Sequence, residues 1–138
     1  MKKKFEGEKR IYAIVSASID GKNGKVVQPI GRQVAQVAHV VSKLRWHEAL
    51  NPFGKGPLTP PSVPAWYAIT TIVLQARDAN ELNHVFALLH TKKIPVTTFA
   101  DNNPEYGPGN FITAICTGPV FKSQVEGILD YLPLWGSK

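Results

Sequence analysis

The chain has 138 residues, of which 43% are hydrophobic, and its 16 Lys and Arg against 10 Asp and Glu give a formal net charge of +6. This length suits one domain with a sizeable core and excludes two full domains. Its apolar runs are too short for a transmembrane helix, and the charged stretch 6–10 lies where a secretory signal would need apolar residues. We therefore expect a cytoplasmic protein without membrane contact, whose single cysteine, Cys116, is a buried thiol.

The positive charge gathers in one half of the chain. Residues 1–75 hold eleven Lys and Arg against four Asp and Glu, whereas residues 76–138 hold five against six. A basic surface of this kind would suit a polyanion such as RNA, because neutralised phosphates release their counterions. The alternative is an ordinary solvated surface with a flexible basic tail at residues 1–9.

The first half of the chain predicts a strand, a loop and a helix. Residues 11–19 are apolar and β-branched, which is typical of a buried strand, and residues 20–29 carry the glycines and charges of a loop. From residue 30 to about residue 47, apolar side chains recur at three- and four-residue spacing, which predicts a helix. Residues 51–64 contain five prolines and predict an irregular loop.

The second half predicts three strands and two helices. We expect strands at 66–76, 95–100 and 111–117, a helix from Asp78 to about Lys92, and a last helix over 121–131. The order β-α-β-α-β-β-α predicts a single α/β domain over 10–138, with a four-stranded mixed sheet flanked by helices. Helical crossovers favour parallel neighbours, and the closely spaced last two strands favour an antiparallel pair.

Common enzyme signatures are missing from the sequence. It contains neither GxxxxGK[ST] nor GxSxG, its glycines do not follow a strand and open a helix, and its four histidines are not spaced as metal ligands. We therefore expect no cofactor and no metal.

A polar stripe on the first predicted helix is the strongest candidate site. Four polar side chains form a stripe in which successive members lie about one helical turn apart: Arg32, Gln36, His39 and Lys43. The N-terminus of the same helix offers unpaired amides and a partial positive charge, which suit an anion. Asp101 directly follows a strand, where open α/β sheets place their ligands. A carboxylate, a guanidinium, an amide and an imidazole could together hold a water and stabilise an oxyanion. The alternative is a solvated helix face with a turn-forming aspartate.

Two segments resemble the type 2 peptidyl-tRNA hydrolase superfamily. Its helix reads approximately K-x-A-A-Q-C-x-H-A, and residues 32–40 read RQVAQVAHV, which keeps Gln36 and His39. The superfamily continues with L-P, then an aspartate six residues after the proline, then a threonine and G-P. This chain has Ile94-Pro95, Asp101, Thr113 and Gly118-Pro119 at the same spacing. The resemblance covers residues 11–131 and implies the fold of these hydrolases.

Two positions depart from that pattern. The superfamily lysine four residues before the glutamine is Arg32 here, and the threonine four residues after the aspartate is Glu105. Arginine can clamp an anion but cannot give up its proton near neutral pH. Glu105 adds a second carboxylate that would repel phosphate.

The resemblance implies hydrolysis of the ester between a peptidyl or acyl group and tRNA. Asp101 would orient a water, Arg32 and Gln36 would stabilise negative charge, and Thr113 would supply a hydroxyl. Contacts to substrate would come from five further residues, of which His39 would also brace the helix against the sheet: His39, Lys43, Lys22, Lys25 and Glu105. The candidate partners are tRNA and, in a homodimer, a second copy of the chain. Two alternatives stay open: a non-catalytic module that binds RNA or a small ligand, and a hydrolase of a small non-RNA substrate.

Overall fold

The computed structural model describes residues 9–50 and 70–136. The Pro-rich stretch at 51–64 and all but the last residue of the predicted tail at 1–9 lie outside the described residues. The elements follow one another as β1 (Lys9–Ser16), β2 (Ser18–Gly21), β3 (Gly24–Val27), α1 (Ile30–Leu50), β4 (Thr71–Ala76), α2 (Ala79–Thr91), β5 (Val96–Asp101), η3 (Pro104–Tyr106), β6 (Phe111–Thr117), β7 (Val120–Phe121) and η4 (Lys122–Gln124).

The main sheet is mixed, as its sequence predicts. Its strands lie in the order β4-β1-β6-β5, and β7 adds a short pairing to the start of β1. The β1–β4 pair, which is joined through α1, is parallel, whereas β1–β6 and β5–β6 are antiparallel. The predicted α/β class, the parallel crossover and the antiparallel pair at the end of the chain are therefore confirmed.

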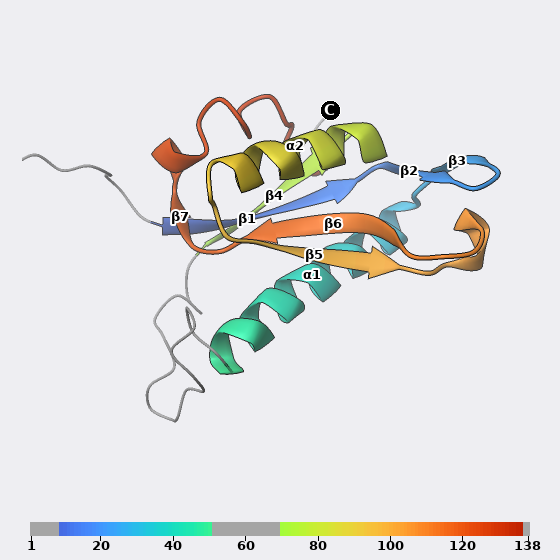
Figure 1. Ribbon diagram of the computed structural model, residues 1–138, viewed down its shortest axis with the longest axis horizontal. Coiled ribbons are helices and arrows are strands. Elements are labelled where there is room, and N and C mark those ends of the chain that lie inside the picture. Colours follow the sequence, from blue (N-terminus) through green and yellow to red (C-terminus); the bar gives the residue numbers. More distant parts are fainter. Residues whose placement is uncertain (1–8, 51–69, 137–138) are drawn as a thin grey trace, which may run out of the picture.

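A helix covers each face of this sheet (Figure 1). On the α1 face, Val40 and Leu44 pack on alternate residues of the two central strands, such as Val15 and Ala114. On the α2 face, Leu82, Val85 and Leu89 pack on the intervening residues, such as Ile14 and Ile115. Strand β1 is covered on both faces, because its residues 11–16 are all buried.

The loop predicted at 20–29 is wrong. Strands β2 and β3 pair with each other there as an antiparallel hairpin, with Gly21 opposite Gly24 around the turn. Gly21 also lies against Tyr106, since a Cβ at position 21 would come within 2.8 Å of the Tyr106 carbonyl oxygen. The hairpin thus docks on η3 through a contact that only glycine permits.

The helix predicted at 121–131 is also wrong. The segment forms the single 3-10 turn η4 and then a series of turns. Gly127 has a φ of +81°, which is left-handed, and its N–H donates to the Asp130 carboxylate at 3.0 Å. A left-handed residue in mid-segment ends any α-helix, yet Val125, Ile128 and Leu129 still reach the core.

The last described segment runs along the outer side of β4. Leu134 forms an antiparallel bridge to Leu74, the Gln75 N–H donates to the Pro133 carbonyl at 3.0 Å, and the Trp135 N–H donates to the Val73 carbonyl at 2.9 Å. No described helix has the length and apolar character needed to cross a membrane.

Candidate functional site

Three of the predicted catalytic residues form one hydrogen-bonded chain between α1 and the sheet. The Thr113 hydroxyl donates to Gln36 Oε1 at 2.9 Å, and Gln36 Nε2 donates to Asp101 Oδ2 at 2.9 Å. The other carboxylate oxygen of Asp101 accepts the N–H of Asn102 at 2.9 Å. Gln36 is 3% exposed and Thr113 is 1% exposed, whereas Asp101 is half-buried and reaches solvent. A buried amide therefore fixes a carboxylate at the surface.

A β-bulge explains why Thr113 faces α1. Pairing of β5 with β6 passes from Phe99↔Ala114 to Ala100↔Ile112, which leaves Thr113 as an extra residue in β6. Ala114 packs on the α1 face of the sheet, so strict alternation would turn its neighbour Thr113 toward α2. The extra residue releases that constraint, and the hydroxyl reaches Gln36 instead.

The two residues that depart from the superfamily pattern contact each other. Arg32 Nη1 lies 2.8 Å from Glu105 Oε2, joining α1 to η3 across 73 positions of sequence. Their hydrogen bond raises the pKa of the Arg32 guanidinium and lowers the pKa of the Glu105 carboxyl from its ordinary value of 4.5. Both stay ionised at neutral pH, and the pair is lost in acid, as the pH falls through the lowered pKa of Glu105.

Two buried residues that sequence reasoning missed hold this ion pair. Gln28 Nε2 donates to the Tyr106 hydroxyl at 2.6 Å, and Gln28 Oε1 accepts from Arg32 Nη1 at 3.3 Å. Tyr106 is fully buried and Gln28 is 2% exposed. Tyr106 neighbours Glu105 in η3, so one buried contact positions both partners of the pair. In the sequence, the one signal for this contact was an aromatic residue, Tyr106, within a segment rich in turn-forming residues.

The remaining predicted contacts are spread more widely. His39 is exposed and stacks on Phe99 of β5 with ring centroids 4.8 Å apart, as a brace between helix and sheet would. Lys43 Nζ donates to the Thr98 carbonyl at 2.8 Å. Lys22 and Lys25 are exposed at the tip of the β2–β3 hairpin. The structure therefore places Lys22 beside η3, where its stem lies against Gly107, but not among the hydrogen-bonded chain.

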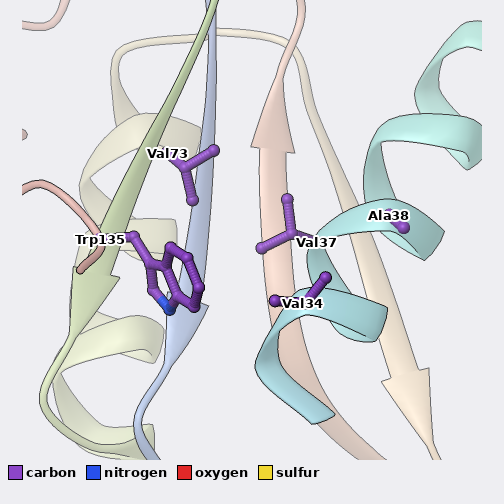
Figure 2. A pocket seen from close by; sticks show the side chains of 5 residues that line it. All are labelled: Val34, Val37, Ala38, Val73 and Trp135. Atoms are coloured by element: carbon purple, nitrogen blue, oxygen red, sulfur yellow. The ribbon is translucent and has the colours of Figure 1, made fainter. Parts of the chain in front are cut away.

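An apolar pocket of about 250 Å³ lies on the opposite flank of α1. Figure 2 shows Trp135 and Val73 on one side of it, and Val34, Val37 and Ala38 of α1 on the other. The lining residue Trp135 is held by Gln33, whose Oε1 accepts from Trp135 Nε1 at 2.9 Å and from Gln75 Nε2 at 2.8 Å. The pocket lining is apolar, and it shares no residue with the hydrogen-bonded chain of Thr113, Gln36 and Asp101.

Gln33 should contribute strongly to stability. Replacing it by leucine removes the acceptor of Gln75 and Trp135 and the donor to the Gln28 carbonyl, a bond of 2.8 Å. We expect Gln33→Leu to lower the free energy of unfolding by about 1–3 kcal/mol, measured by denaturant titration. Ser42→Leu, on the exposed side of α1, is the control and should change it by less than about 0.5 kcal/mol. Equal effects of the two variants would contradict this role of Gln33.

The hydrogen-bonded chain of Thr113, Gln36 and Asp101 has the chemical groups that activation of a water molecule needs. A half-buried carboxylate that reaches solvent, with both oxygens oriented by N–H donors, can hold a water, and the Arg32 guanidinium, one helical turn along α1 from Gln36, can face developing negative charge. Within residues 9–50 and 70–136, no three His, Cys, Asp or Glu side chains come together as a metal site would require.

Comparison with known proteins identifies the family. No curated protein sequence matches the chain significantly. The family model described as Peptidyl-tRNA hydrolase PTH2 matches residues 11–135, which run from within β1 to the segment along β4 and include every residue of the hydrogen-bonded chain. The chain therefore belongs to the peptidyl-tRNA hydrolase PTH2 family.

Proposed function

We propose that this protein hydrolyses the ester between an acyl group and the terminal ribose of tRNA. The single observation that carries the proposal is the direct bond from Gln36 to Asp101, which joins a helix residue to a strand-end carboxylate 65 positions away. Family membership supports the same reaction class.

In the proposed reaction, Asp101 accepts a proton from a water whose oxygen attacks the ester carbonyl carbon. The bond between that carbon and the ribose oxygen breaks, and the proton passes to the ribose oxygen, so the products are a free acid and a ribose hydroxyl. Gln36 and Thr113 keep Asp101 in place. Arg32 bonds Glu105 and Gln28 through Nη1 and also interacts with Tyr106, and in the proposed reaction its positive charge faces the oxyanion.

The direct test is cleavage of acyl-tRNA by the purified chain. Release of the amino acid from radiolabelled aminoacyl-tRNA and from its N-acetylated form should be enzyme-dependent and should be lost in Asp101→Ala. Failure with both substrates by a folded protein would overturn the proposal.

A second candidate is a non-catalytic module that binds a small ligand or RNA. The favouring observation is that Arg32, which would otherwise meet an anion, is already paired with Glu105. Under this alternative, ligand binding would persist in the Asp101→Ala variant while no ester would be cleaved at all.

If tRNA is the partner, its affinity should depend steeply on salt. Each phosphate neutralised contributes a log–log slope of about −0.7 to −0.9, so replacing Lys22, Lys25 and Lys43 by alanine should flatten the slope by up to about 2 to 3. Filter binding between low and physiological salt measures it. The matched control removes three exposed lysines elsewhere, Lys92, Lys93 and Lys122, and should leave the slope unchanged. A flat salt dependence in the parent would contradict tRNA binding.

Two further expectations from the sequence stay predictions: that the protein forms a homodimer and that it is located in the cytoplasm.

A further inference from the structure

A second pocket lies at the edge of the sheet that carries Asp101. Its volume is about 250 Å³, and its lining comes from β2, the first turns of α2 and the start of β6. Phe111, one of the lining residues, is the register partner of Asp101 in the β5–β6 pair. The pocket and the carboxylate of the proposed reaction therefore lie at the same end of these two strands.

The lining combines apolar surface with amides that have no partner. Phe111 is partly buried and meets the buried ring of Tyr106 edge to face, with centroids 5.6 Å apart, whereas Ile112 is 37% exposed. Asn83 and Asn110 are exposed, and in the part of the chain that the structure describes neither side chain makes a hydrogen bond. An aromatic ring and free amides are the groups with which proteins hold an unpaired nucleobase, by stacking and by hydrogen bonds to its edges.

The charge around the pocket favours a base inside it and a phosphate outside it. Asp20 is the one charged residue of the lining, and its exposed carboxylate can only accept hydrogen bonds. It would repel a phosphate but accept the N–H groups of an exocyclic amine. Lys25 stands opposite Asp20 in the β2–β3 hairpin, so a cation lies next to the pocket but not in its lining.

The size of the pocket suits a single ring system. Pockets that enclose a drug-sized ligand hold about 300–1,000 Å³, and this one is smaller. We propose that it binds the terminal adenine of tRNA, the base whose ribose carries the acyl group. This inference rests on the proposed function and names the part of the partner that the site holds. Asp20 accepts the adenine amino group, and the amides of Asn83 and Asn110 bond its ring nitrogens.

The first test is binding of adenosine monophosphate, followed by nuclear magnetic resonance. Saturable shifts should appear at Asn83 and Asn110, and inosine monophosphate should bind at least about fivefold more weakly, since a carbonyl replaces the amino group. Asp20→Asn should bring the two nucleotides within about twofold of each other, because an amide can also donate to the carbonyl. No saturable shift at the pocket, or an unchanged preference in Asp20→Asn, would overturn the inference.

A matched pair of variants on α2 localises the binding. Asn83→Ala should weaken adenosine monophosphate about three- to tenfold through the lost hydrogen bonds. Asn80→Ala removes another exposed asparagine of the same helix, outside the pocket lining, and should leave the affinity unchanged. Alanine is a better helix former than asparagine, so both variants should fold. Equal affinities of the two variants would contradict the pocket.

The last test links the pocket to tRNA and separates it from the hydrolase. Uncharged tRNA should displace adenosine monophosphate, and tRNA trimmed of its terminal adenosine should do so about tenfold less well. Equal displacement by the two tRNAs would overturn the inference. With acyl-tRNA, Asn83→Ala should raise KM about three- to tenfold and leave kcat unchanged, because the base is held alike before and during the reaction. Displacement that needs the terminal adenosine, without any cleavage, would keep the adenine pocket and overturn the hydrolase. Cleavage with an unchanged KM in Asn83→Ala would do the reverse.

Discussion

The Asp101→Asn variant is expected to hydrolyse acyl-tRNA about 10²- to 10⁴-fold more slowly than the parent. Asparagine has nearly the same shape but cannot take a proton from water. Both oxygens of Asp101 accept N–H donors, from Gln36 and Asn102, and an amide nitrogen cannot accept either bond. Single-turnover rates with excess protein measure the chemical step directly.

The control for this variant is Asp130→Asn. Asp130 also accepts a backbone N–H at 3.0 Å, but it lies in the turns after η4, away from Gln36. Asp130→Asn should hydrolyse acyl-tRNA at the parent rate, and thermal unfolding should show that both variants are folded. A folded Asp101→Asn protein that retains activity within about threefold would remove Asp101 from the role of base.

The second large effect is expected when Arg32 and Glu105 are changed together. Arg32→Lys alone leaves a lysine that Glu105 can still hold, and Glu105→Thr alone leaves a guanidinium that cannot lose its proton near neutral pH. In the double variant the lysine is released from the carboxylate. We expect cleavage of N-acetylated aminoacyl-tRNA to rise about tenfold beyond the product of the two single effects.

A double-mutant cycle on kcat/KM measures this coupling. The cycle is informative because the two side chains are in contact at 2.8 Å, the condition under which effects are not additive. Strict additivity would show that the ion pair does not restrain the cation. Loss of activity in both variants that carry Arg32→Lys, with activity kept in Glu105→Thr alone, would show that the guanidinium itself is needed for cleavage.

The main sheet could be predicted because its central strand β1 is buried on both faces. Residues 11–16 form an unbroken apolar stretch apart from Ser16, and such a stretch flanked by helical periodicity indicates a covered strand. The hairpin of β2 and β3 could not be predicted in this way. Each strand has four residues, and what holds them is their mutual pairing and the contact of Gly21 with Tyr106, which local composition does not reveal.

The helix predicted at 121–131 was wrong although its local pattern favoured a helix. Its apolar spacing at Val125, Ile128 and Leu129 is genuinely helical, and all three are buried. A left-handed Gly127 interrupts the backbone between them. Apolar spacing reports which side chains reach the core, whereas the path of the backbone between them depends on a single residue.

Half of the candidate site was accessible from sequence. Gln36 was identified by its place on the polar stripe, Asp101 by its place after a strand and Thr113 by the resemblance, and their hydrogen bonds confirm that they lie together. Their catalytic roles stay predictions. The contact of Arg32 with Glu105 was not foreseen, although two departures of opposite charge within one site are a signal that such a pair can form.

The segment that runs along β4 has a consequence for solubility. An edge strand with unpaired N–H and C=O groups is a template for another chain, and β4 would be such a strand beside an apolar pocket. Instead, the Gln75 N–H and the Val73 carbonyl are already occupied by residues 133 and 135. Intermolecular strand addition at this edge must first peel the segment away, together with the indole of Trp135 that Gln33 anchors. The same segment that contributes Trp135 to the pocket therefore guards the β4 edge of the sheet against strand addition.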